Sequence, residues 1–474
     1  MEAKAYDLYI GGEWIKTGNY IPVLHKYTGE CIAQIARAEQ HHVQTAVEAA
    51  WETFRNDRLT PFQRYKILLK ASELMEARRD EMELSLIREV GKTRKDAMNE
   101  LDRTINTLRL SAEEAKKIHG EMIPLQSTEG SENRLGFTIR VPKGVIGAIT
   151  PFNYPLLLST HKIAPALAAG NTLVVKPATV TPLATFLLVD VLEEAGLPKG
   201  YVNIVTGAGS EVGEWLLDEE RIAMYTFTGS GEVGRHIKAR SGMRPVALEL
   251  GNNSPNIVHH DADVELAARQ TAARSFHNAG QACIAVQRIY VHEDVFLAFS
   301  EQYIEHVKQL KVGDPEDPAT DVGPMISEKE ARRTEEWVRE AISEGATSLL
   351  PIRREGALFY PAVLVNTKPD MKVVCREVFA PVVTIIPYSD LEDAFAQAND
   401  SEYGLQAGIF TRDLNVAMKA ARTLEYGGVV INDVSTYRND VMPYGGVKNS
   451  GLGKEGPRYA VEEMTDERMV VINL

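Results

Sequence analysis

The sequence contains few cysteines, no block of basic residues and no long apolar run. Its 474 residues include only three cysteines, Cys31, Cys283 and Cys375. These are too few and too widely spaced for a disulfide framework or a zinc site, so we expect no bound metal. Unpaired thiols fit a reducing cytoplasm. The question they leave is whether one of the three is a nucleophile.

The charge balance is acidic, with 52 lysines and arginines against 66 aspartates and glutamates and a formal net charge of −14. An acidic surplus without a basic patch argues against nucleic acid or an anionic membrane as a partner. The most apolar stretch, residues 156–175, includes Lys162 and Pro165 and has the pattern of a helix followed by a strand, not of a membrane span. The first residues are acidic and lack an apolar run, so we expect no signal peptide.

Apolar, β-rich segments alternate with helical segments in two regions of the chain. In the first region we expect strands at 144–150, 171–177, 201–206, 222–228 and 245–250, with helices at 156–168, 182–195, 210–217 and 231–241. In the second we expect strands at 287–292, 380–387, 407–411 and 428–432, with helices at 263–278, 294–309, 327–344 and 413–424. This alternation predicts an α/β protein with two doubly wound domains, which bind ligands at the carboxyl ends of their strands.

The two ends of the chain have a different pattern. The first 120 residues are expected to be mainly helical after a short strand at 6–10, with a long helix at 94–119. A strand-like segment at 136–141 follows a polar loop. The chain ends in a strand at 468–473 that has no partner nearby in sequence. Such a strand either returns to its own sheet or pairs with another subunit.

Residues 229–234 read Gly-Ser-Gly-Glu-Val-Gly, between an expected strand and an expected helix. Glycines at this place let the backbone approach a pyrophosphate at a helix N-terminus. A turn of this kind serves the packing of strand against helix equally well. The motif alone therefore leaves cofactor binding and simple packing both open.

Two residues are candidates for catalysis. Cys283 follows Gly280-Gln281, a break after an expected helix where a thiol can be exposed, although a lone cysteine is usually a buried small apolar residue. Glu249 lies at the end of the apolar strand 245–250, where desolvation would raise the pKa of its carboxyl towards that of a general base. The other interpretation is a glutamate exposed at a sheet edge.

Seven segments of the chain together resemble one known family. They are Pro151-Phe-Asn-Tyr-Pro155, Val174-Val-Lys-Pro177, Thr228-Gly-Ser-Gly-Glu-Val-Gly234, Leu248-Glu-Leu-Gly251, Gly280-Gln-Ala-Cys283, Glu377-Val-Phe-Ala-Pro381 and Pro443-Tyr-Gly-Gly-Val-Lys-Asn-Ser-Gly-Leu-Gly453. In this order they resemble the aldehyde dehydrogenase superfamily over essentially the whole chain. The resemblance implies a Rossmann-like cofactor domain, an α/β catalytic domain and a small β oligomerisation flap.

The resemblance also implies a mechanism. Cys283 would attack the aldehyde as a thiolate, and Asn153 together with the backbone N–H of Cys283 would hold the resulting oxyanion. Transfer of hydride to NADP or NAD would leave a thioester. Glu249 would then activate water to hydrolyse it, so that the product is a free carboxylic acid.

The same resemblance assigns residues to the cofactor. Lys176 would bond the adenosine ribose, and Gly229 and Ser230 would meet the pyrophosphate. Glu377 would hold the ribose on the nicotinamide side, and Phe379 would pack beside the nicotinamide.

The chain departs from NAD-preferring members at one position. Those members often carry a glutamate three residues after the lysine, where its carboxylate repels a 2′-phosphate. Thr179 stands there in this sequence. A neutral hydroxyl removes that repulsion, so we expect NADP to be admitted beside NAD, and a preference for NADP is left open. The other interpretation is that Thr179 only starts a loop.

The segment 435–443 resembles the branch that oxidises lactaldehyde, sulfolactaldehyde, phosphonoaldehydes and glyceraldehyde 3-phosphate. In that branch an arginine at the position of Arg438 helps to bind an anionic group, and Arg103 matches a second such arginine. Two arginines at one pocket would favour a small anionic or hydroxylated aldehyde. Arg103 on a solvated helix face is the alternative.

Other functions are open from the sequence. They are oxidation of a semialdehyde such as succinic semialdehyde, broad aldehyde specificity, formation of an acyl-coenzyme A, and a non-enzymatic structural role. The presence of both Cys283 and Glu249 argues against the last two.

The resemblance divides the chain into three parts. Residues 1–120 and 143–248 would form the cofactor domain, 249–442 the catalytic domain, and 121–142 with 455–474 the flap. Strands near 121–125 and 136–142 would form the flap, and the terminal strand at 468–473 would pair across a dimer. We therefore expect a homodimer or homotetramer.

Overall fold

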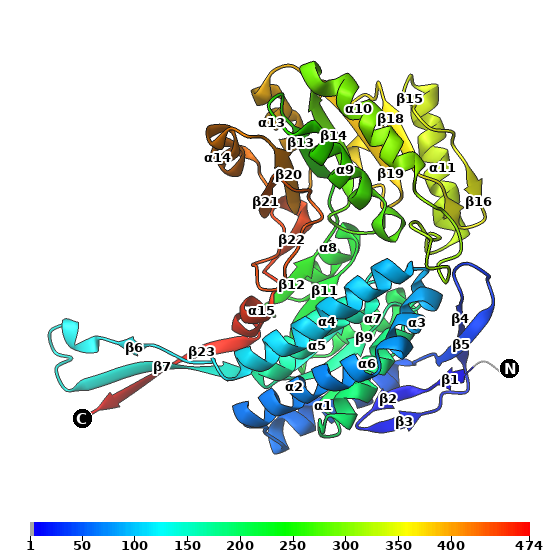
Figure 1. Cartoon of the computed structure of the whole chain (residues 1–474). Helices are drawn as coiled ribbons and strands as arrows, with labels where there is room; N and C mark the ends of the chain where they lie inside the picture. The colour runs from blue at the N-terminus through cyan, green and yellow to red at the C-terminus, as the bar shows by residue number, and fades with distance from the viewer. Residues whose placement is uncertain (1–3) are drawn as a thin grey trace.

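The computed structural model describes residues 4–474 and has two α/β lobes and a projecting arm (Figure 1). The predicted fold class is confirmed, because each lobe is built on a largely parallel sheet with helices packed against it. We call the part containing the sheet of β8–β12 the first lobe and the part containing the sheet of β13–β21 the second lobe. The arm consists of β6, β7 and β23.

The first lobe contains an eight-stranded sheet in the order β22-β12-β11-β8-β9-β10-β2-β3. Its strands are β2 (Leu8–Ile10), β3 (Glu13–Ile15), β8 (Val145–Ile149), β9 (Thr172–Lys176), β10 (Val202–Ile204), β11 (Ile222–Thr228), β12 (Val246–Glu249) and β22 (Gly451–Leu452). The five central strands β8 to β12 are parallel to one another. The strand order reverses between β8 and β11, and ligands bind at such a switch point beyond the carboxyl ends of the strands.

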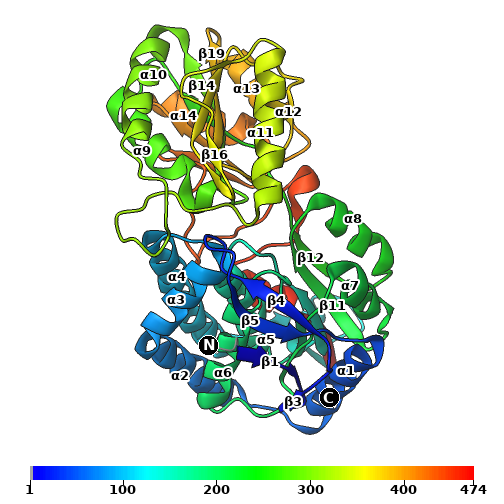
Figure 2. The same cartoon turned by 90° about the vertical axis from the view of Figure 1, so that its right-hand side faces the viewer.

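Helices cover both faces of this sheet (Figure 2). They are α1 (Gln40–Asn56), α2 (Pro61–Ala77), α3 (Arg79–Val90), α4 (Arg94–Ala115), α5 (Pro155–Ala169), α6 (Leu183–Glu194), α7 (Gly209–Asp218), α8 (Gly231–Arg240) and α15 (Pro457–Glu463). Every residue of α5 is buried, because this helix packs against α2, α4, α6 and α15 as well as against the sheet. The helix expected at 94–119 ends earlier, at Ala115.

The amino-terminal region contains more β structure than its sequence predicts. In addition to β2 and β3, it forms a small sheet of β1 (Lys4–Tyr6), β5 (Cys31–Ala36) and β4 (Tyr20–Leu24). These strands are short, and exposed residues interrupt their apolar pattern.

The second lobe contains a seven-stranded sheet in the order β15-β18-β19-β14-β13-β20-β21. Its strands are β13 (Ser254–Val258), β14 (Val286–His292), β15 (Thr347–Ser348), β18 (Ala362–Val365), β19 (Val382–Tyr388), β20 (Gln406–Phe410) and β21 (Gly428–Ile431); β16 (Arg354–Glu355) and β17 (Leu358–Phe359) form a separate hairpin. Its helices are α9 (Val264–Ser275), α10 (Glu293–Lys308), α11 (Glu328–Ser343), α12 (Lys372–Cys375), α13 (Leu391–Asn399) and α14 (Leu414–Thr423).

The sequence prediction missed seven elements of this lobe. Strand β13 begins Ser-Pro-Asn, which carries no apolar signal although all five residues are buried. The others are the short strands β15 to β18, the four-residue helix α12 and the nine-residue helix α13. The expected helix 263–278 ends at Ser275, because Asn278 and Ala279 adopt left-handed backbone angles.

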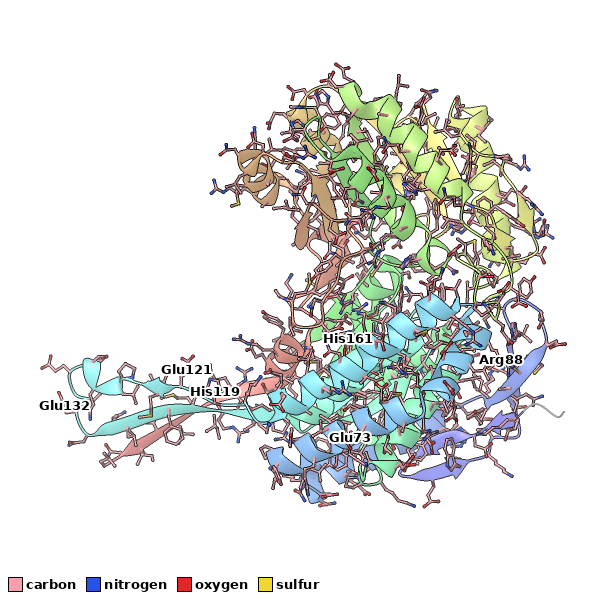
Figure 3. The ribbon with its side chains drawn as sticks, in the orientation of Figure 1. Glu73, Arg88, His119, Glu121, Glu132 and His161 are labelled. Carbon is pink, nitrogen blue, oxygen red and sulfur yellow. The ribbon has the colours of Figure 1, made fainter. Side chains whose placement is uncertain are left out.

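The arm is a three-stranded antiparallel sheet of β6 (Met122–Ile123), β7 (Arg134–Pro142) and β23 (Thr465–Asn473). Glu132 marks its far end in Figure 3. The terminal strand returns to its own chain, with all nine residues of β23 in register with β7 from Thr465↔Pro142 to Asn473↔Arg134. The expected strand at 121–125 is shorter, and a 3₁₀ turn at Leu125–Ser127 follows it.

Two searches of residues 4–474 gave no match. No helix there is both long and apolar enough to cross a membrane. Within the same residues, no group of three or more His, Cys, Asp or Glu side chains is arranged to hold a metal ion.

Candidate active site

A cavity of about 720 Å³ is lined by residues of both lobes. The carboxyl ends of β8, β9, β11 and β12 contribute to it, as the switch point of the first sheet predicts. Nine of the residues selected from the sequence line it: Asn153, Lys176, Gly229, Ser230, Glu249, Cys283, Glu377, Phe379 and Arg438. The cavity lining does not include Thr179 or Arg103.

The loop that carries Cys283 has an unusual backbone. Asn278, Ala279 and Gly280 have φ angles of 49°, 53° and 71°, all in the left-handed region. For the two non-glycine residues this conformation costs roughly 1–2 kcal/mol each. Gly280 has no alternative, since a Cβ there would fall 2.1 Å from the carbonyl oxygen of Ala380.

Hydrogen bonds from several elements hold this strained loop. The backbone N–H of Asn278 donates to Oδ2 of Asp96, on α4, at 2.9 Å. Its side-chain amide donates to the carbonyl oxygens of Asn153 and Gln281, both at 3.1 Å. The backbone N–H of Ile326 donates to Gln281 Oε1 at 2.8 Å. Sequence reasoning did not select Asp96 or Asn278, because neither is reactive and Asp96 lies about 180 residues before the loop.

The thiol of Cys283 lies 3.0 Å from the hydroxyl of Tyr444. Burial raises the pKa of the Cys283 thiol to about 11, although the Tyr444 hydrogen bond and the charge of Arg438 act in the opposite direction. The thiol is therefore protonated at neutral pH in this state. Tyr444 is a site residue that the sequence prediction missed, although it stands in one of the seven matching segments.

Asn153 is buried close to the nucleophile loop. Its side-chain amide donates to the carbonyl oxygen of Gln281 at 3.0 Å, two residues before Cys283. The backbone N–H of Cys283 donates no hydrogen bond to any of residues 4–474. The nucleophile loop thus has one side-chain N–H donor bonded to it at Gln281, and one backbone N–H, that of Cys283, without an acceptor among these residues.

Glu249 ends β12, which pairs with β11 on one side and β22 on the other. The glutamate is buried, so the interpretation as an exposed edge residue is wrong. Burial and the neighbouring carboxylate of Glu455 raise the pKa of Glu249 well above its ordinary value. Its Oε2 has no hydrogen-bond partner among residues 4–474. A buried carboxyl of this kind, facing a cavity with a thiol, has the properties of a general base.

Lys176 lines the cavity, whereas Thr179 lies outside its wall. The ammonium of Lys176 donates to the carbonyl oxygen of Pro177 at 3.1 Å, and burial lowers the pKa of this lysine to about 8. Thr179 donates its hydroxyl to the carbonyl oxygen of Gly207 at 2.6 Å. The side chain at position 179 is therefore a neutral hydroxyl and not a carboxylate.

The strand-to-helix turn at Gly229 and Ser230 fits close approach of a ligand. Ser230 caps α8, and its hydroxyl accepts the N–H of Val233 at 3.4 Å. The N–H of Gly229 donates to the carbonyl oxygen of Glu249 at 3.0 Å. A Cβ at position 229 would fall 2.6 Å from the ring of Phe227, so a side chain does not fit there.

Glu377 and Phe379 come from the second lobe. Glu377 accepts the backbone N–H of Asn252 at 2.9 Å, and burial raises the pKa of its carboxyl to about 7. Phe379 has a left-handed φ of 52° and packs edge-on against Phe152, with ring centroids 5.8 Å apart.

The two arginines have different surroundings. Arg438 lines the cavity, pairs with Glu455 at 2.8 Å and lies 3.6 Å over the ring of Tyr444. Arg103 forms a two-point ion pair with Asp440, at 2.7 and 3.3 Å. It is therefore neither a solvated surface residue nor part of the cavity wall.

The fold and this constellation of cysteine, glutamate and asparagine agree with the family comparison. The model of the aldehyde dehydrogenase family matches residues 14–470, and the chain belongs to that family. It is an oxidoreductase that acts on aldehydes.

Individual relatives narrow the branch. The chain is 52% identical to a 3-sulfolactaldehyde dehydrogenase of Priestia aryabhattai, over 100% of this chain and 99% of that one. It is 44% identical to a lactaldehyde dehydrogenase of Methanococcus vannielii, over 98% and 100%. The crystal structure of an NADP-dependent glyceraldehyde-3-phosphate dehydrogenase from Bacillus halodurans C-125, complexed with NADP, superposes with a TM-score of 0.97 at 38% identity and covers 100% of both chains.

Proposed function

We propose that this protein oxidises a small hydroxylated or anionic aldehyde to the carboxylic acid through a thioester on Cys283, with NADP or NAD as cofactor. The observation that carries the proposal is that Cys283, Glu249 and Arg438 line one cavity. Relatives named for sulfolactaldehyde, lactaldehyde and glyceraldehyde 3-phosphate support this substrate class.

The residues present fit a dinucleotide. The buried ammonium of Lys176 has one carbonyl partner and is directed to the cavity wall, where a ribose hydroxyl or phosphate would stabilise its charge. Gly229 and Ser230 would accommodate the pyrophosphate at the N-terminus of α8. Glu377 and Phe379 would hold the nicotinamide end. When bound, the nicotinamide supplies the hydride acceptor.

In the first chemical step, the sulfur of Cys283 attacks the aldehyde carbonyl. Arg438 and the hydroxyl of Tyr444 favour the thiolate, since both lower the pKa of the thiol against the effect of burial. The side-chain amide of Asn153 and the N–H of Cys283 then donate to the oxyanion. For this the amide of Asn153 exchanges its bond with Gln281 for one with the substrate.

In the second step, Glu249 removes a proton from the water that hydrolyses the thioester. Its raised pKa makes the ionised carboxyl a stronger base than that of an ordinary glutamate. A base in this position releases a free acid, whereas a coenzyme-A-acylating enzyme needs none.

We propose that NADP is admitted as a cofactor beside NAD. The hydroxyl of Thr179 is neutral and is held by Gly207, so it presents no negative charge to a 2′-phosphate. The ratio of kcat/KM for the two cofactors tests this. A preference for NAD above about a hundredfold would contradict it.

The function itself is tested by NAD(P)H production from a panel of aldehydes, including lactaldehyde, 3-sulfolactaldehyde, glyceraldehyde 3-phosphate, succinic semialdehyde and propanal. We expect activity that Cys283→Ala abolishes, and a free acid as product with or without coenzyme A. An acyl-coenzyme A product, or reaction with succinic semialdehyde alone, would contradict the proposal.

We propose the same division into parts as the resemblance implies. Residues 1–120 and 143–248 bind the cofactor, 249–442 carry the nucleophile, and 121–142 with 455–474 form an oligomerisation flap, of which the helix α15 packs against α4 and α5 of the first lobe. Strand β23 is the edge of the arm sheet, and exposed apolar residues such as Met469, Val471 and Ile472 lie on it. These features support a homodimer or homotetramer. The three unpaired cysteines support a location in the reducing cytoplasm. Sedimentation at several concentrations tests the assembly.

A further inference from the structure

A cluster of charged and ionisable side chains lies beneath the substrate end of the cavity. The charge cluster consists of Arg103, His161, Lys162, Arg438, Asp440 and Glu455. His161 and Lys162 belong to α5, and Figure 3 labels His161 near the centre of the molecule. Asp440 connects Arg103 to the rest of the cluster.

Asp440 contacts both neighbouring helices. Its Oδ1 lies 2.7 Å from Nη2 of Arg103 on α4 and 3.2 Å from Nε2 of His161 on α5. The side chain of Asp440 is 3% exposed and that of Arg103 21% exposed. The second half of the cluster is centred on Glu455, which lies 2.8 Å from Arg438 Nη2 and 3.4 Å from Lys162 Nζ.

The protonation states of the cluster follow from these contacts. Burial and the charge of Arg438 lower the pKa of His161, which is therefore neutral at pH 7. Burial opposes ionisation of Asp440, but the hydrogen bond with His161 and the charge of Arg103 lower the pKa of Asp440 below its ordinary value. In the same way Lys162 and Arg438 lower the pKa of Glu455. Within the charge cluster, three cations thus face two carboxylates, which leaves one positive charge. Glu249 lies outside this count: the charges of Arg438 and Lys162 reach it, but burial and the carboxylate of Glu455 raise its pKa well above the ordinary value and so disfavour its ionised form.

One donor of the cluster is free for a ligand. Nε of Arg438 is buried and has no hydrogen-bond partner among residues 4–474, while the residue lines the cavity. An uncompensated cation in a buried site is costly, and an anion that neutralises it is bound strongly. A second negative charge on the ligand would in turn be left unpaired.

We propose that Asp440 is a specificity-determining residue: by neutralising Arg103 it leaves the charge cluster one positive charge, which selects an aldehyde with a single negative charge. The inference rests on the proposed function and narrows its substrate class. A sulfonate or carboxylate carries one charge. A phosphate ester carries nearly two at pH 8, since its second pKa is about 6.

Three aldehydes with the same 2-hydroxypropanal skeleton test the inference. They are lactaldehyde, 3-sulfolactaldehyde and glyceraldehyde 3-phosphate, with charges of about 0, −1 and −2 at pH 8. The kcat/KM of each is measured and expressed relative to lactaldehyde for the same variant. For the wild type we expect 3-sulfolactaldehyde to give the highest value.

The substitution Asp440→Asn keeps the shape and one oxygen acceptor but frees the charge of Arg103. We expect glyceraldehyde 3-phosphate to gain at least about tenfold over 3-sulfolactaldehyde, because the extra cation interacts with the extra anionic charge. Asp102→Asn is the matched control. It also replaces an aspartate by asparagine, but at an exposed position of α4, where the side chain is 60% exposed. The ratio of kcat/KM for glyceraldehyde 3-phosphate to that for 3-sulfolactaldehyde should stay within about twofold.

Arg103→Gln changes the charge of the cluster in the opposite direction, because it removes a cation. It tests the inference independently, even if Asp440→Asn does not fold. It leaves Asp440 charged, so 3-sulfolactaldehyde should lose at least about tenfold relative to lactaldehyde. The inference would be overturned if kcat/KM for the two anionic aldehydes, relative to lactaldehyde, changes no more than in Asp102→Asn. It would also be overturned if this relative kcat/KM changes in the same direction in Asp440→Asn and in Arg103→Gln. A wild type that oxidises none of the three aldehydes would contradict the proposed function instead.

Discussion

Removing the carboxylate of Asp96 separates the positioning of the nucleophile from its chemistry. Asp96 does not line the cavity, yet its Oδ2 accepts the backbone N–H of Asn278 at 2.9 Å and thereby connects α4 of the first lobe to the nucleophile loop of the second. We predict that Asp96→Ala lowers kcat by about tenfold to a hundredfold. Asp96→Asn, which keeps an oxygen acceptor, should retain most of the activity.

The magnitude follows from the contacts. A buried N–H that loses its acceptor costs about 1–3 kcal/mol. The same bond opposes relaxation of Asn278 and Ala279, whose left-handed angles store roughly 1–2 kcal/mol each. Without this bond, we expect the loop to relax towards ordinary backbone angles and to displace Cys283. A loss of 1.4 kcal/mol in transition-state stabilisation corresponds to about tenfold in rate.

The assay combines steady-state kinetics with alkylation of Cys283 by iodoacetamide. Asp96 is also the third residue of α4 and bonds the capping hydroxyl of Thr93, so a lower melting temperature alone proves nothing about positioning. The control Asp102→Ala changes an exposed carboxylate of the same helix. If Asp96→Ala melts earlier but keeps the wild-type kcat and alkylation rate, or if Asn and Ala at this position behave alike, the reasoning is wrong.

Three further predictions concern the thiol, the loop glycine and a buried ion pair. Alkylation of Cys283 without cofactor should rise about tenfold per pH unit between pH 7 and 10, since the thiol is protonated below its pKa of about 11; a plateau near pH 8 would refute this. Gly280→Ala should abolish activity, because its Cβ would fall 2.1 Å from a backbone oxygen, whereas Gly313→Ala, with only ordinary contacts, should remain active in the same NAD(P)H assay. Glu100→Ala should lower the free energy of unfolding by about 3–5 kcal/mol in urea, because it leaves the fully buried Lys92 without its carboxylate partner at 3.2 Å; a change below about 1 kcal/mol would contradict it.

The sequence predicts the regular part of the fold because parallel strands buried on both faces are continuous apolar runs. Strands β8 to β12 and the helices between them lie within a few residues of their expected ranges. Prediction fails where an element is short or is buried for tertiary reasons. Strand β13 contains Ser254, Pro255 and Asn256 and is recognisable only from its neighbours β14 and β20.

The site shows the same division. Reactive residues with a local pattern, such as Cys283 after Gly280-Gln281, could be selected from the sequence. Residues that act by contact across the chain could not, since nothing near Asp440 indicates that its carboxylate faces Arg103, 337 residues away. The sequence placed Arg103 either in a pocket or in solvent, and the ion pair is a third arrangement that only the fold creates.

One face of α4 connects three parts of the site. Asp96, Glu100 and Arg103 are spaced by four and three residues, so they lie on the same side of the helix. Asp96 holds the nucleophile loop, and Arg103 holds Asp440, which follows Arg438 by two residues.

Glu100 completes this face, since it accepts the first free N–H groups of α5 at Leu156 and Leu157, both at 3.0 Å, directly after the segment that carries Asn153. A helix that contributes nothing to the cavity wall thus sets the relative positions of nucleophile, oxyanion donor and anion-binding arginine. Its polar face is buried for that reason, although an exposed amphipathic helix would have the same sequence pattern.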